Sequence, residues 1–60
     1  MKNIKVFKHR IYAYDEMRKG HYPVDEATTW EEALRMYEAH KQYSIDVQIV
    51  SKHFEQAVLQ

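Results

Sequence analysis

The pattern of apolar and polar positions divides this chain of 60 residues into strand, strand, helix and strand, followed by a tail. The clearest element is residues 29–41, where apolar side chains recur about every 3.6 residues, as in an amphipathic helix. Thr29 is the predicted N-cap, and Glu32, three residues later, completes a capping box. Thr28 with Glu31 offers the same pattern one residue earlier, so the start of the helix is open by one position.

The periodicity also predicts which face of this helix is buried. The predicted face consists of Trp30, Leu34, Tyr37 and the stem of Lys41, with Ala33 beside them and Met36 and His40 at the margin. Charged residues occupy the opposite side. Since the rest of the fold would cover this one apolar face, we expect the helix to organise folding and the functional surface to lie elsewhere.

Residues 2–14 are rich in β-branched and aromatic types and contain no Gly or Pro, which favours a strand. Apolar side chains occur at both even and odd positions, so both faces of this strand would carry them. Three interpretations are open. A bulge near residues 8–10 would turn both sets toward one core. Otherwise the outer face of one long strand binds a partner, or residues 8–10 form a short hairpin.

A turn and a second strand are predicted next. Gly20, the only glycine, is expected to supply a turn position with positive φ. Residues 21–27 predict a shorter strand at a sheet edge, because Pro23 cannot donate to a ladder. This edge is one possible route to a partner, by strand pairing.

The C-terminal third predicts one more strand and an ambiguous tail. Ile45, Val47 and Ile49 alternate with polar residues, as in a strand with one buried face. Residues 51–60 fit a short helix, with Ser51 as N-cap, slightly better than they fit a strand. Both interpretations remain open.

These elements predict an α+β fold: a two-layer α/β arrangement with a small antiparallel β-β-α-β sheet and one principal helix. One domain covers residues 1–60. A chain of this length buries only about 60% of the surface that its unfolded form exposes. Because it has no Cys for disulfides, we expect the fold to need a partner, most simply as a homodimer.

Charge is unevenly distributed along the chain. Residues 1–20 contain six basic residues (Lys and Arg) and two acidic residues, whereas residues 21–60 contain three basic and seven acidic residues. The net charge of the whole chain is zero. No apolar run is long enough to span a bilayer, and no signal-peptide pattern is present. We therefore expect a cytoplasmic protein with no membrane partner.

The sequence predicts no catalytic residue, no metal site and no cofactor. One glycine is too few for a glycine-rich phosphate loop, and the four His lack the spacings of metal ligands. Acidic residues occur as adjacent pairs, which point to opposite faces of a strand or lie about 100° apart on a helix. We therefore expect a protein that is not an enzyme.

The aromatic content favours protein binding. Five Tyr, one Trp, two Phe and three Met exceed what one small core can bury, and such residues are enriched in interface cores. We expect a small regulator or inhibitor that binds a larger protein stoichiometrically. Its size and layout are similar to those of phage and mobile-element accessory proteins, which implies a modulator of a host or defence system. The predicted partner-binding residues are Phe7, Arg10, Tyr12, Tyr14, Tyr22 and Tyr43.

The alternative hypothesis is a small RNA- or single-stranded-DNA-binding protein. Basic residues alternate with stackable aromatic residues in the first strand, as on sheets that bind single strands. The acidic remainder of the chain would repel phosphate, which makes this hypothesis the weaker one. The predicted nucleic-acid contacts are Lys5, Lys8, His9 and Arg10.

Overall fold

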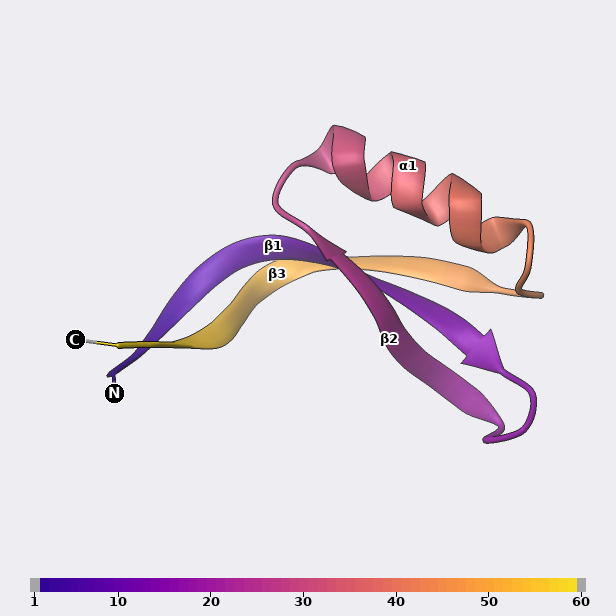
Figure 1. Ribbon diagram of the computed structural model, residues 1–60, viewed down its shortest axis with the longest axis horizontal. Coiled ribbons are helices and arrows are strands. Elements are labelled where there is room, and N and C mark those ends of the chain that lie inside the picture. The colour runs from indigo at the N-terminus through magenta and orange to yellow at the C-terminus, as the bar shows by residue number, and fades with distance from the viewer. Residues whose placement is uncertain (1, 60) are drawn as a thin grey trace.

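The computed structural model describes residues 2–59, which form a three-stranded antiparallel sheet with a helix on one side (Figure 1). The elements are β1 (Lys2–Asp15), β2 (Gly20–Ala27), α1 (Trp30–Lys41) and β3 (Val47–Val58). The strand order is β2-β1-β3, so β1 is central and the other two strands are edges. The predicted α+β class, the order of elements and the edge position of the Pro23 strand are confirmed.

β1 divides into two halves with different surroundings. Residues 9–15, the packed half, pair with β2, and residues 9–13 pair with β3 as well. Residues 2–8, the projecting half, pair with β3 alone and extend with it beyond the helix (Figure 1). Ile11 in the packed half is completely buried, whereas Phe7 in the projecting half is 50% exposed. The core therefore occupies one half of the sheet.

The predicted long strand is confirmed, but neither the hairpin nor the bulge near residues 8–10 is present. The β1–β3 register is regular throughout. The irregularity lies in β2, where Ile11 pairs with Asp25 and Tyr12 with Pro23, so Val24 is the extra residue. It is adjacent to Pro23, whose missing N–H already interrupts regular pairing.

α1 begins where the sequence predicts. The Thr29 hydroxyl oxygen accepts a hydrogen bond from the N–H of Glu32 at 3.2 Å, as expected of an N-cap. Acidic residues in the first turn and basic residues in the last turn complement the helix dipole.

The buried face of α1 differs from the prediction. Ala33 is completely buried, with Met36 and Tyr37 packed against the core, whereas Trp30 is 51% and Leu34 40% exposed. The small side chain of Ala33 lets the helix approach the sheet closely, which leaves the larger apolar residues on its flank. The sheet thus covers only part of the apolar surface of the helix and leaves Trp30 and Leu34 largely open, contrary to our expectation.

The β1–β2 turn also differs from the prediction. Lys19 has the positive φ, at 54°, and Gly20 does not. The Asp15 carboxylate accepts hydrogen bonds from the N–H groups of Met17 (2.9 Å) and Arg18 (3.2 Å). These bonds fix the turn so that its left-handed position falls one residue before the glycine.

The tail is a strand, so the helix interpretation of residues 51–60 is wrong over the described residues; Gln60 lies outside them. β3 runs from Val47 to Val58 and pairs with residues 2–13 of β1. These partners are distant in the chain, so local periodicity cannot reveal them. Ile45, which the sequence places in this strand, precedes it and is exposed.

Candidate functional site

A hollow of about 340 Å³ lies at the hairpin end of the sheet, between the β1–β2 turn and the loop after α1. Its lining includes three of the predicted partner-binding residues, Tyr14, Tyr22 and Tyr43. Tyr43 is 87% exposed, so most of its ring is open to solvent. We call this site the tyrosine hollow.

A salt bridge and a stacked ring shape one wall of the tyrosine hollow. Arg18 Nε donates to Asp15 Oδ2 at 2.9 Å, and the Arg18 guanidinium carbon lies 3.8 Å from the centroid of the Tyr22 ring. The Arg18 side-chain hydrogen bond is the largest cause of the lowered pKa of Asp15, followed by the backbone N–H of Arg18. The hairpin turn thus holds Tyr22 against a fixed cation.

The other wall is attached to the loop after α1. The N–H of Tyr14 donates to the carbonyl oxygen of Asp46 at 2.9 Å. His21 Nε2 lies 2.7 Å from Asp46 Oδ2, and the His21 ring meets the Tyr14 ring edge-on at 5.4 Å. These contacts join segments 25 residues apart in the chain at the hairpin end of the sheet.

A second cluster lies on the sheet face opposite α1. Successive strand residues alternate between faces, so even positions of β1 and β3 point away from the helix. Phe54 is 9% exposed there because three cations surround its ring. The charged groups of Arg10, Lys52 and Lys8 lie 4.0, 5.3 and 5.9 Å from its centroid.

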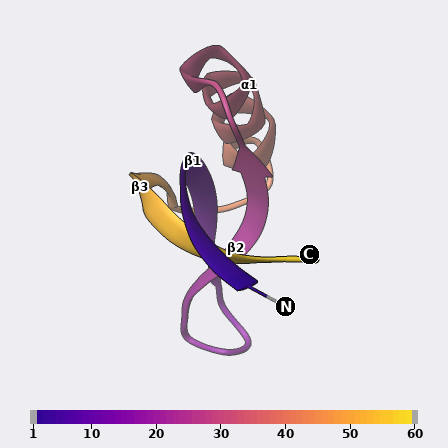
Figure 2. The ribbon, with the colours of Figure 1, turned by 90° about the vertical axis from the view of Figure 1, so that its left-hand side faces the viewer.

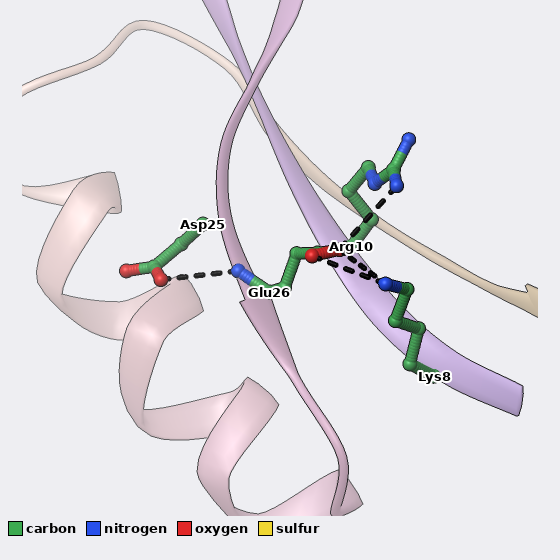
Figure 3. A network of polar contacts seen from close by, with 4 residues as sticks. All are labelled: Lys8, Arg10, Asp25 and Glu26. Atoms are coloured by element: carbon green, nitrogen blue, oxygen red, sulfur yellow. Dashed lines mark hydrogen bonds and ion pairs between the residues drawn. The ribbon is translucent and has the colours of Figure 1, made fainter. Parts of the chain in front are cut away.

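Glu26 of β2 partly neutralises this basic cluster (Figure 3). Its Oε2 lies 2.8 Å from Lys8 Nζ and 3.3 Å from Arg10 Nη2, and its N–H donates to Asp25 Oδ1 at 3.0 Å. The hydrogen bond from Lys8 is the main cause of the lowered pKa of Glu26. The pKa of Arg10 is raised by hydrogen bonds with Tyr12 first and Glu26 second.

The predicted partner-binding residues fall into three groups. Tyr14, Tyr22 and Tyr43 all line the hollow, Tyr22 from the helix side of the sheet and Tyr14 from a strand position whose side chain points to the open face. Arg10 and Tyr12 lie on the open sheet face beside Glu26. Phe7 lies in the projecting half on the helix side, where its ring meets His53 edge-on at 5.2 Å. Half of the predicted set therefore shares one site.

The predicted nucleic-acid contacts are not brought together. Lys8 and Arg10 share the open face, whereas Lys5 and His9, at odd positions, point to the helix side. His9 is buried, and its Nδ1 lies 2.7 Å from Ser51 Oγ, so it is not accessible to a phosphate.

Several residues of these two sites were not predicted from the sequence pattern. Lys52 and Phe54 were missed because the pairing of the tail with β1 is not visible in its residue pattern. Glu26 joins Lys8 only through strand pairing, which spacing does not show. Arg18 could have been found, since an Asp followed three residues later by Arg is typical of a side-chain-fixed turn.

Comparison with known proteins finds no matching family model, no matching curated protein and no matching solved structure. Across residues 2–59, no three His, Cys, Asp or Glu side chains gather as they would around a metal ion. The described chain contains no helix long and apolar enough to cross a membrane. The geometry of the residues is therefore the basis of the functional proposal.

Proposed function

We propose that this protein is a non-enzymatic cytoplasmic regulator or inhibitor that binds a larger protein stoichiometrically through the tyrosine hollow. The supporting observation is that Tyr22 and Tyr43, together with Tyr14, line one concave surface. Tyrosine supplies large contact area with few rotatable bonds and is enriched among residues that dominate binding energy. The size and β-β-α-β layout also fit a phage or mobile-element modulator of a host or defence protein.

The shape of the molecule supports a role that depends on a partner. Its accessible surface is 4733 Å², whereas a compact monomer of this mass exposes about 4,200 Å². Its radius of gyration is 13.0 Å, compared with about 10 Å for a compact chain of this length. An extended form with a small core leaves apolar side chains for an interface.

The lining of the hollow favours an Arg or Lys of the target as the anchoring side chain. Its charged lining residues are two carboxylates, Asp15 and Glu16, and one guanidinium, Arg18, already paired with Asp15. Tyrosine rings attract cations through their faces, and the Arg18–Tyr22 pair is an internal example. A long basic side chain would place its stem against the rings and its charge near Glu16.

Site-specific photocrosslinking tests this proposal. A photoreactive phenylalanine analogue at Tyr43 should capture one larger protein in cells that contain the target. The same analogue at Leu59, equally exposed at the opposite end of the molecule, is the matched control. Glu16→Gln should lower the yield at position 43. Absence of an adduct at position 43, or the same adducts at both positions, would contradict the proposal.

The basic cluster around Phe54 supports nucleic-acid binding as the second candidate. Labelled single-stranded RNA and DNA should then bind with an affinity that falls steeply with salt. Glu26→Gln should strengthen that binding, because the substitution frees Lys8 and Arg10 from their carboxylate. No binding at low salt by either form removes this candidate.

A further inference from the structure

The outer edge of β3 carries a continuous row of outward-facing backbone groups. The hydrogen bond from Tyr14 N–H to the Asp46 carbonyl oxygen continues the β1–β3 register. It shows which pairs of residues in that ladder are hydrogen-bonded, namely those with even numbers. Bonded pairs alternate along an antiparallel ladder, so even-numbered residues of β3 bond to β1. The residues that direct N–H and C=O away from the sheet are Val47, Ile49, Ser51, His53, Glu55 and Ala57.

The two edges of the sheet differ in their protection against strand pairing. β2 has 8 residues, and it contains Pro23 and a register shift, two features that obstruct an added strand. β3 has 12 residues, without Pro, Gly or an irregularity in its register. Of the two edge strands, β3 is therefore the one better suited to accept another strand.

The helix presents exposed apolar side chains toward the same edge. The Trp30 ring meets the His9 ring edge-on at 5.5 Å, and His9 in turn contacts Ser51 of β3, so the flank of α1 that carries Trp30 lies near β3. Leu34 lies about 40° from Trp30 around the helix, on the same flank. Figure 2 shows β2 and β3 on opposite sides of β1 below the helix. A strand added to β3 would extend the sheet beneath Trp30 and Leu34.

Symmetry limits how two β3 edges can pair. An antiparallel pair related by a two-fold axis has that axis perpendicular to the sheet, so both helices lie on the same face. Odd-numbered residues of β3 then lie opposite odd-numbered residues of the partner's β3. Their outward N–H and C=O groups can therefore hydrogen-bond to each other in both copies. The chain exposes roughly 500 Å² more surface than a compact monomer of its mass. This excess is close to the ~600 Å² that each partner buries in the smallest stable interfaces.

The charges on β3 distinguish between registers that symmetry allows. With Lys52 on the axis, two ammonium groups would face each other at close range, which is unfavourable. With His53 on the axis, Lys52 lies opposite the partner's Phe54, and Ser51 lies opposite the partner's Glu55. This register also overlaps residues 48–58, more of β3 than the register centred on Ser51.

We propose that a second copy of this chain occupies the β3 edge, with His53 opposite the partner's His53, to give a continuous six-stranded sheet. This inference goes beyond the proposed function because it concerns a different surface. The tyrosine hollow lies at the hairpin end and remains open in both copies. Failure of the dimer would leave the crosslinking result at Tyr43 unaffected, and the two proposals can be separated.

The absence of Cys from the sequence allows a direct test of the register. Under mild oxidation, His53→Cys should form a disulfide-linked dimer, because directly opposite residues lie about 5.5 Å apart between Cα atoms. Ser51→Cys is the matched control, since its two copies would be about 13 Å apart along the strands. Equal crosslinking at both positions, or crosslinking at 51 alone, would overturn the proposal.

Proline substitutions test the edge itself. Glu55→Pro removes an outward N–H and should give a folded monomer by circular dichroism and analytical ultracentrifugation, at concentrations where the wild type is a dimer. Gln56→Pro removes an inward N–H bonded to β1 and should unfold the ribbon instead. The proposal is wrong if the wild type is monomeric at tens of micromolar (about the concentration of a weak dimer). It is also wrong if Glu55→Pro remains dimeric.

Discussion

The two halves of β1 have similar residue types but different neighbours. Ile4 in the projecting half is partly exposed, whereas Ile11 in the packed half is completely buried. β2 pairs only with the packed half, and the projecting half pairs with β3 alone. Burial along this strand is therefore decided by the elements beside it, and apolar side chains in the projecting half remain available to partners.

The same division separates the two proposed interfaces. The tyrosine hollow is built at the end of the packed half, where the turn, the helix loop and two strands hold its walls. The proposed dimer is centred on β3 opposite the projecting half, where backbone groups lack a neighbour. A rigid base for the target and an unpaired edge for a second copy can thus coexist in a chain of 60 residues.

Truncating one isoleucine in each half should give the largest contrast. Ile11→Ala creates a cavity in the core and should lower the free energy of unfolding by about 2–5 kcal/mol. Ile4→Ala removes a half-exposed side chain and should cost about 1 kcal/mol or less. Urea unfolding at one protein concentration measures both. Equal losses would show that the core extends over the whole strand.

Enlarging a helix alanine tests the close contact between α1 and the packed half. Ala33→Leu should destabilise the protein by about 1–3 kcal/mol, because Ala33 is completely buried and its surroundings have no room. Ala39→Leu is the matched control and should be nearly neutral, since that residue is exposed. Thermal unfolding distinguishes the two variants, and a neutral Ala33→Leu would refute the close approach.

Relieving the turn of the packed half should give a smaller, stabilising effect. Lys19→Gly removes the strain of a left-handed lysine, about 1–2 kcal/mol, offset by about 0.5–1 kcal/mol of added unfolded-state entropy. Gly20→Ala should be close to neutral, because its added Cβ would lie at ordinary contact distance, 3.4 Å, from the Tyr22 ring. A destabilised Lys19→Gly variant would contradict the observed turn geometry.

The smallest effect should come from Glu26, which joins β2 to the boundary between the halves. Its pKa is lowered in the folded protein, so its stabilisation is present above the unfolded pKa and is lost as pH falls through the folded value. Wild type should exceed Glu26→Gln in stability at pH 7, and the difference should shrink as pH falls below about 4.3, the ordinary pKa of Glu, and vanish below the folded pKa. A difference that is independent of pH would exclude this ion pair as its cause.

Local chemistry made part of the fold predictable. The cap at Thr29 depends on residues close to it in the chain, and the edge position of Pro23 depends on its missing N–H, so both follow from the sequence. The tail was misassigned because its strand depends on pairing with residues 2–13, which no local pattern records. The helix is rotated about its axis relative to the prediction, with Ala33 at the centre of its contact with the sheet. The periodicity did not show this because Ala33 is small and the pattern is dominated by large residues such as Trp30.

The candidate site was predictable to a similar extent. Exposed tyrosines are a compositional signal, and three of the predicted residues do line the hollow. The hollow depends on the Tyr14–Asp46 hydrogen bond between distant segments, which the sequence does not specify. Phe7 was grouped with them only by residue type and lies in the projecting half, and Tyr12 shares the open face with Tyr14 but does not line the hollow.

The division of β1 can be tested most directly by residue-resolved amide hydrogen exchange. Even-numbered residues of β1 bond to β3, as the Tyr14–Asp46 hydrogen bond shows, so odd-numbered residues direct their N–H groups toward the β2 side. We expect the amides of residues 9, 11 and 13 to exchange only on global unfolding, and those of residues 3, 5 and 7 to exchange rapidly. Equal protection of both sets would contradict a packed half and a projecting half.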